Sequence, residues 1–79
     1  MKGETLVHSC RVEIADSHYE IEIFLRQDGW HIAKTLLAHD DILINDAESL
    51  EAALKRQQEL LPLALDSRAI LAEYRSSRN

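Results

Sequence analysis

Residues 26–46 contain the side chains of this sequence that are best able to do chemistry, including two histidines and four aspartates. His31, His39 and Asp41 carry the imidazole and carboxylate groups that bind zinc and iron in proteins. If these three side chains converged on one metal ion, the protein could be a small metal-assisted hydrolase. This is one hypothesis for its function.

The same residues also suit a purely structural role in turns and strands. The sequence has no H-x-x-x-H and no C-x-x-C spacing, and its aspartates stand where turns and a helix cap are expected. A metal site needs three or four converging ligands, whereas His31 is expected on an outer sheet face and His39 in a loop. We therefore expect no metal and no cofactor.

Cys10 is the single cysteine, so a disulfide within one chain is excluded. We expect it on the core face of a strand, where a free cysteine behaves as a small hydrophobe. His8 shares that face, but no third group is apparent that would orient it for nucleophilic catalysis. A lone cysteine without a secretory leader or a long apolar run indicates a cytoplasmic protein and no membrane span.

The formal net charge of −5 argues against nucleic-acid binding by the whole surface and suits a basic protein partner. Glu13, Glu20 and Glu22 are expected together on the outer face of a sheet, where acidic side chains contact solvent or a basic partner. Trp30 is expected at one end of the core or as an interface anchor. We expect these four residues to contact partners, and the protein to be a non-catalytic interaction module.

The elements that must position these side chains begin with two strands, predicted over residues 5–14 and 19–27 from their alternation of apolar and polar residues. Good turn residues separate the two strands. A two-residue loop at residues 16–17 would place Cys10 opposite Ile23 and bring the two apolar faces together.

A third strand is predicted over residues 30–37, because the Asp-Gly pair at residues 28–29 is a strong signal for a two-residue type I′ turn. That turn would place His31 opposite Arg26 on the outer face. The short apolar run over residues 42–45 is a candidate fourth strand.

Helical periodicity follows over residues 47–61, with Asp46 as the expected N-cap. Pro62 should end or kink this helix, since an interior proline costs about 3 kcal/mol. A second helix is predicted over residues 63–76, with Asp66 as its cap. The predicted fold is a single α+β domain over residues 1–79, in which an antiparallel meander of three or four strands is covered on one face by the first helix.

A 79-residue chain has a small core and a thin margin of stability, so self-association is expected and the chain is predicted to be a homodimer. The predicted helix over residues 63–76 is one candidate contact in that dimer.

The middle of the chain resembles a known family. The segments YEIEIFLRQDGWHIAKTLL and DDILINDAESLEAALKRQQELL, within residues 18–62, resemble the HicB-like antitoxin domain, and ESLEAAL matches the start of that family's helix particularly well. The resemblance implies a partial ribonuclease-H-like α+β fold without nuclease residues. It also implies that the protein binds and neutralises a small, basic, RNA-cleaving toxin.

Overall fold

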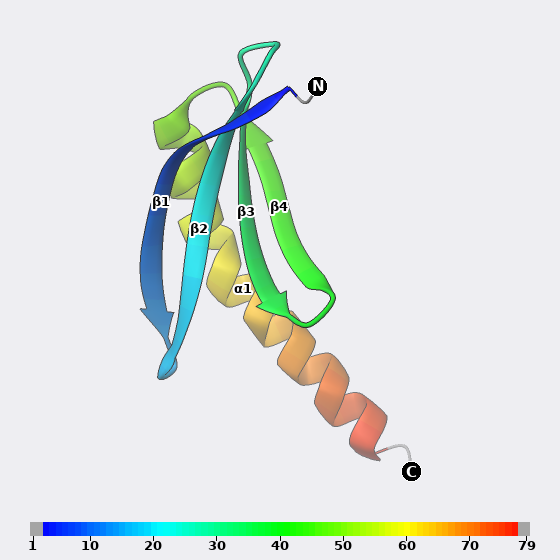
Figure 1. Ribbon diagram of the computed structural model, residues 1–79. Coiled ribbons are helices and arrows are strands. Elements are labelled where there is room, and N and C mark those ends of the chain that lie inside the picture. Colours follow the sequence, from blue (N-terminus) through cyan, green and yellow to red (C-terminus); the bar gives the residue numbers. More distant parts are fainter. Residues whose placement is uncertain (1–2, 78–79) are drawn as a thin grey trace.

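The computed structural model describes residues 3–77 and shows an α+β fold in two layers (Figure 1). Four strands form an antiparallel meander in the order β1-β2-β3-β4, and a single helix packs on one face. The elements are β1 (Glu4–Ile14), β2 (Ser17–Arg26), β3 (His31–Ala38), β4 (Asp41–Ala47) and α1 (Leu50–Ser77). The predicted meander is confirmed with four strands, whereas the prediction of two helices was wrong.

The turn between β1 and β2 is formed by Ala15 and Asp16, whose φ angles are +52° and +67°. Two consecutive positive φ values are the mark of a type I′ turn. The prediction of a loop at residues 16–17 was therefore wrong, and Cys10 lies opposite Ile21 instead of Ile23. Because a two-residue displacement preserves the faces, Cys10 still packs against the core as predicted.

The turn between β2 and β3 has three residues instead of the predicted two. The N–H of Arg26 donates to the carbonyl of Trp30 at 2.9 Å, and Gly29 closes the loop at a φ of +93°. This extra residue makes a bulge that glycine tolerates without a steric cost. It moves the register by one residue, so His31 lies opposite Leu25 and not opposite Arg26.

A one-residue change of register moves every side chain of a strand to the other face. The prediction that His31 lies on the outer face was therefore wrong. Ala33 and Thr35 are buried in β3, while Lys34 lies opposite Glu22 on the outer face. The bulge thus places Lys34 on the outer face. The predicted turn would have placed this charged residue opposite Ile23, which is buried.

The core lies between the inner face of the sheet and the first half of α1. Its buried members include alanines from β3, β4 and α1, and such small side chains allow the helix to lie close to the sheet. Cys10 and Val12 of β1 complete one side of this core. The buried residues of the cluster are Ile21, Ile23, Ala33, Ala47 and Ala53.

Ser49 caps α1, because its Oγ accepts a hydrogen bond from the N–H of Ala52 at 3.1 Å. The predicted cap Asp46 instead lies within β4, so that prediction was wrong. The helix also continues through Pro62, which is exposed. The carbonyl of Gln58, which loses its helical donor to this proline, lies on an exposed part of the helix where water can satisfy it.

Because the helix is continuous, Asp66 lies inside α1 and caps nothing. Every side chain described from residue 66 to residue 74 is exposed, so this half of α1 projects past the sheet (Figure 1). Arg68 is its anchor, donating two hydrogen bonds to Asp41 at 2.6 and 2.8 Å. Among residues 3–77, no helix combines the length and apolar character that crossing a bilayer requires.

A buried polar network joins α1 to the inner face of β3 and β4. Gln57 is fully buried and donates to the hydroxyl of Thr35 at 2.9 Å and to the carbonyl of Leu43 at 3.0 Å. Its Oε1 accepts a hydrogen bond from Asn45 Nδ2 at 2.6 Å. These bonds satisfy a glutamine inside an otherwise apolar layer, where an unpaired amide would be costly.

Candidate functional site

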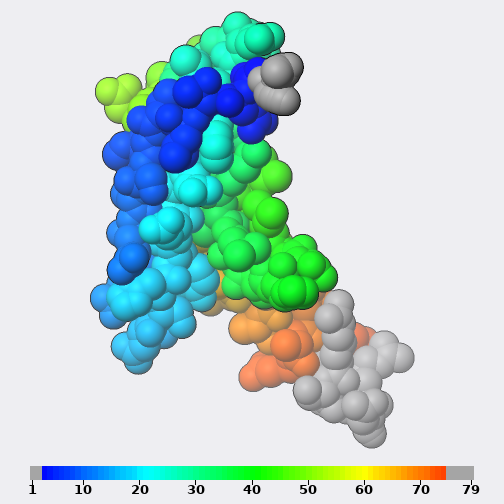
Figure 2. All heavy atoms as spheres, in the orientation of Figure 1, coloured from blue at the N-terminus to red at the C-terminus, as the bar shows by residue number. Residues whose placement is uncertain are grey.

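The sheet opens between its two middle strands. Residues 22–25 of β2 pair with residues 31–34 of β3, and beyond these four pairs the two strands diverge (Figure 1). The divergence leaves a hollow of about 430 Å³ between β2 and the β3–β4 hairpin, on the face opposite α1 (Figure 2). We call this feature the outer hollow; it is lined by His18, Tyr19, Glu20, Glu22, Lys34, Leu36 and Ile42.

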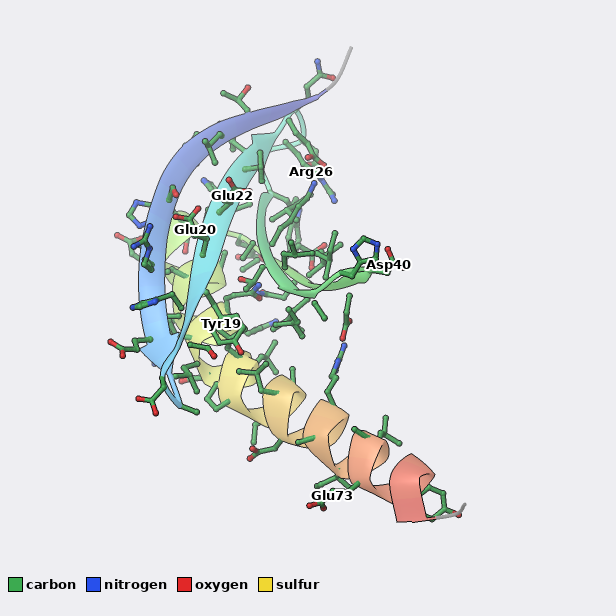
Figure 3. All side chains as sticks on the ribbon, turned by 60° about the horizontal axis from the view of Figure 1, so that its bottom comes forward. Tyr19, Glu20, Glu22, Arg26, Asp40 and Glu73 are labelled. Carbon is green, nitrogen blue, oxygen red and sulfur yellow. The ribbon has the colours of Figure 1, made fainter. Side chains whose placement is uncertain are left out.

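The β2 wall of the outer hollow is acidic, because it carries Glu20 and Glu22 (Figure 3). Glu13 lies on the same sheet face, where its carboxylate is 3.8 Å from the His18 imidazole. Among the described residues, no cation forms an ion pair with Glu20 or Glu22. Their carboxylates are therefore available to a group that enters the hollow, although Arg11 and Lys34 are their neighbours across the sheet.

The one lysine of the lining forms its ion pair outside this wall. Lys34 Nζ is 2.9 Å from Glu4 Oε1 and lies 4.8 Å from the centre of the Phe24 ring. Both contacts hold the ammonium group toward β1 and the ring, and both are favourable for a cation. Lys34 therefore pairs with Glu4 and not with Glu22, its cross-strand neighbour, and Arg11 lies opposite Glu20 without forming an ion pair with it.

The opposite wall is aliphatic. Leu36, Ile42 and Ile44 are 60%, 51% and 57% exposed, and Leu36 lies directly opposite Ile42 in the sheet. We call these three residues the aliphatic patch. Large apolar side chains that cluster on a surface commonly mark a site of protein contact. The outer face thus combines an acidic wall with an apolar one.

Sequence reasoning did not identify the aliphatic patch, although the signal was present. Residues 42–44 are three consecutive apolar residues in a short strand. Since successive side chains of a strand point to opposite faces, such a run must place apolar groups on both faces. Leu43 points toward the helix layer, where its carbonyl accepts from Gln57, and the two isoleucines remain outside.

The structure does not bring His31, His39 and Asp41 together. His31 begins β3 and is half-buried, whereas His39 is exposed at the β3–β4 turn. The carboxylate of Asp41 forms an ion pair with Arg68. Within residues 3–77, no three histidine, cysteine, aspartate or glutamate side chains lie close enough to hold a metal ion. His31 Nδ1 is buried without a hydrogen-bond partner among the described residues.

Two carboxylates, those of Asp28 and Asp41, have a lowered pKa because arginines bind them. The hydrogen bonds from Arg68 lower the pKa of Asp41, and Asp41 in turn raises the pKa of Arg68. Hydrogen bonds from Arg26 and from the Trp30 N–H lower the pKa of Asp28. Each pair fixes a turn: the first ties the β3–β4 turn to α1, and the second closes the β2–β3 turn. Both are structural contacts outside the outer hollow.

Trp30 lies apart from the acidic wall. It is 38% exposed and lines a separate hollow of about 280 Å³ near the start of α1, together with Arg56 and Glu48. The four residues expected as partner contacts therefore lie on two surfaces. Glu13, Glu20 and Glu22 share the outer face, and Trp30 belongs to another surface.

Comparison of the chain with protein-family models, with curated proteins and with solved structures finds no match in any of the three.

Proposed function

We propose that this protein is a non-catalytic interaction module that binds a small basic protein through the outer hollow. The observation that carries the proposal is the pairing of Glu20 and Glu22, which form no ion pair among the described residues, with the aliphatic wall formed by Leu36 and Ile42. The resemblance of residues 18–62 to HicB-like antitoxin domains supports the same partner class. The specific form of the proposal is antitoxin-type binding that neutralises a small basic toxin.

The two walls suit the side chains of a basic segment. Arginine and lysine have apolar stems that pack on aliphatic surfaces while their charged heads reach polar groups. A basic residue in the outer hollow could lay its stem on Leu36 and Ile42 and direct its head to Glu20 or Glu22. The net charge of −5 would also speed the approach of a basic protein.

The test uses a model ligand, an extended peptide of alternating leucine and arginine, measured by isothermal titration calorimetry. The double variant Glu20→Gln/Glu22→Gln removes the acidic wall. The matched control Glu59→Gln/Glu73→Gln removes the same charge from exposed positions on α1, and Figure 3 shows Glu73 far from the wall. A peptide of alternating leucine and glutamate controls for apolar contact alone.

Exposed ion pairs are each worth about 0.2–1 kcal/mol, so losing two should weaken binding by roughly 2- to 30-fold. The control double variant should bind within about twofold of the unmodified protein. Equal weakening by both double variants would show that only net charge matters. Equal affinity for the basic and the acidic peptide would also contradict the proposed function.

A further inference from the structure

The two free edges of the sheet differ in how they are protected. β1 carries a register irregularity between Leu6 and His8, and charged residues stand along it at Glu4, Arg11 and Glu13. Bulges and charges are the usual devices that prevent an edge strand from pairing with another chain. The β1 edge is therefore blunted.

The β4 edge has none of these devices along its central part. β4 pairs with β3 in an unbroken register from Ile42 to Ala47, and the strand contains no lysine, arginine or proline. Among the described residues, no strand pairs with its far side. Its outward side chains Ile42 and Ile44 are more than half exposed, so the strand presents both an open backbone edge and an apolar surface.

We propose that β4 pairs antiparallel with β4 of a second copy of this chain, about a twofold axis that passes by Ile44 perpendicular to the sheet. Antiparallel pairing of one strand with itself is self-complementary, which is what a twofold dimer requires. A second copy is a suitable occupant because antiparallel pairing about Ile44 covers the whole strand and sets no like charges opposite each other. This inference goes beyond the proposed function and does not depend on it.

The register centred on Ile44 is favoured for three reasons. It pairs all seven residues of β4, it places Ile44 opposite Ile44 of the second copy, and it sets Ile42 opposite Asp46, so that no like charges face each other. Centring the pair on Leu43 would place Asp46 opposite Asp40 of the second copy. Centring it on Asn45 would carry the pairing into Ser49, which caps α1.

An axis perpendicular to the sheet keeps both copies facing the same way. The dimer would therefore have one eight-stranded sheet, with both helices on one face and both outer hollows on the other. The two Ile44 side chains would meet across the axis and shield each other from water, which adds a small apolar contribution to a chain with a small core.

Cysteine crosslinking tests this register. In a Cys10→Ala background, Ile44→Cys would place the two new cysteines directly opposite each other, with Cα atoms about 4.5–5.5 Å apart, which a disulfide can span. Ile42→Cys is the matched control, because it lies on the same strand and face with similar exposure. Its two copies would be roughly 13 Å apart, at about 3.4 Å for each of four residues along the strand.

We expect Ile44→Cys to form a covalent dimer on mild oxidation and Ile42→Cys alone to remain monomeric on a non-reducing gel. The double variant Ile42→Cys/Asp46→Cys should crosslink, since these positions face each other. Equal crosslinking of the two single variants would indicate random collision, and absence of crosslinking in Ile44→Cys would refute the register.

Analytical ultracentrifugation gives an independent test on the unmodified protein, whose chain mass is 9.0 kDa. We expect a species of twice this mass, which Ile44→Lys converts to monomer. Ile70→Lys makes the same change at an exposed position on α1 and should leave the dimer intact. A monomer at high concentration, or dissociation by Ile70→Lys but not by Ile44→Lys, would overturn the proposal. No basic peptide enters these experiments, so their failure would not bear on the proposed function.

Discussion

Replacing Gln57 by leucine should destabilise this protein severely, although leucine is apolar and close to glutamine in size. Gln57 is fully buried, and its amide bonds Thr35, Leu43 and Asn45. Leucine fills most of the space, so the cost of a cavity is small. The dominant effect is that three polar groups lose a partner in a buried layer.

The magnitude follows from these three groups. A buried donor or acceptor left without a partner costs about 1–3 kcal/mol. Asn45 keeps a long contact of 3.5 Å from its Nδ2 to the carbonyl of Ala53, so its loss is partial. At the low end of this range, about 1 kcal/mol for each of the three groups, the free energy of unfolding falls by about 3 kcal/mol. Small domains are stable by only about 5–15 kcal/mol, so this is a large fraction.

Urea unfolding followed by circular dichroism measures the change. The matched control is Gln58→Leu, the same substitution at the exposed neighbouring position, which should stay within about 0.5 kcal/mol of the unmodified protein. Adding Thr35→Val to Gln57→Leu removes the hydroxyl that Gln57→Leu leaves without a partner. The double variant should therefore lose about 1 kcal/mol less stability than the sum of the losses of the two single variants. A loss below about 1 kcal/mol for Gln57→Leu, or one equal to that of Gln58→Leu, would refute the reasoning.

Three further predictions concern the helix. Pro62→Ala should raise the free energy of unfolding by about 1–3 kcal/mol, because it restores a helical hydrogen bond at an exposed position; unchanged stability in urea would contradict this. Ser49→Ala should cost about 0.5–2 kcal/mol and Asp46→Ala less than about 0.5 kcal/mol, and the reverse order would contradict Ser49 as the cap. The contact of Asp41 with Arg68 lowers the pKa of Asp41 in the folded state, so its contribution to stability is complete above the ordinary value of 3.8 and is lost as the pH falls below it. Helical Cα chemical shifts beyond Arg68 should therefore decline on acidification, and Asp41→Asn should remove that decline; an unchanged decline in the variant would refute the link.

The strands, the meander order and the helix-covered face could be predicted from alternation and periodicity. Which side chains of β3 point to the core could not be predicted, because this depends on one extra residue in the β2–β3 turn. An Asp-Gly pair is compatible with both a two-residue turn and a three-residue loop with a bulge. The observed loop holds Arg26, Asp28 and Trp30 together through hydrogen bonds that periodicity does not reveal.

The helix and the site show two other limits of sequence reasoning. Pro62 was expected to end or kink the helix, but α1 continues through it, since the proline is exposed and the preceding Leu61 is buried in the core. The outer hollow arises where β2 and β3 diverge, and no residue pattern marks that divergence. Glu20 and Glu22 were identified correctly as neighbours on the outer face, whereas their aliphatic counterpart became apparent only with the sheet assembled.

The outer hollow is proposed to receive a basic, partly apolar segment of a partner protein. The most direct measurement is a titration of the isotope-labelled protein with the leucine–arginine peptide, followed residue by residue in amide and methyl NMR spectra. We predict that shifts concentrate at Glu20, Glu22, Leu36 and Ile42 and diminish at high salt, as exposed ion pairs do. Shifts confined to α1 or to the surroundings of Trp30, or no shifts at millimolar peptide, would contradict binding in the outer hollow.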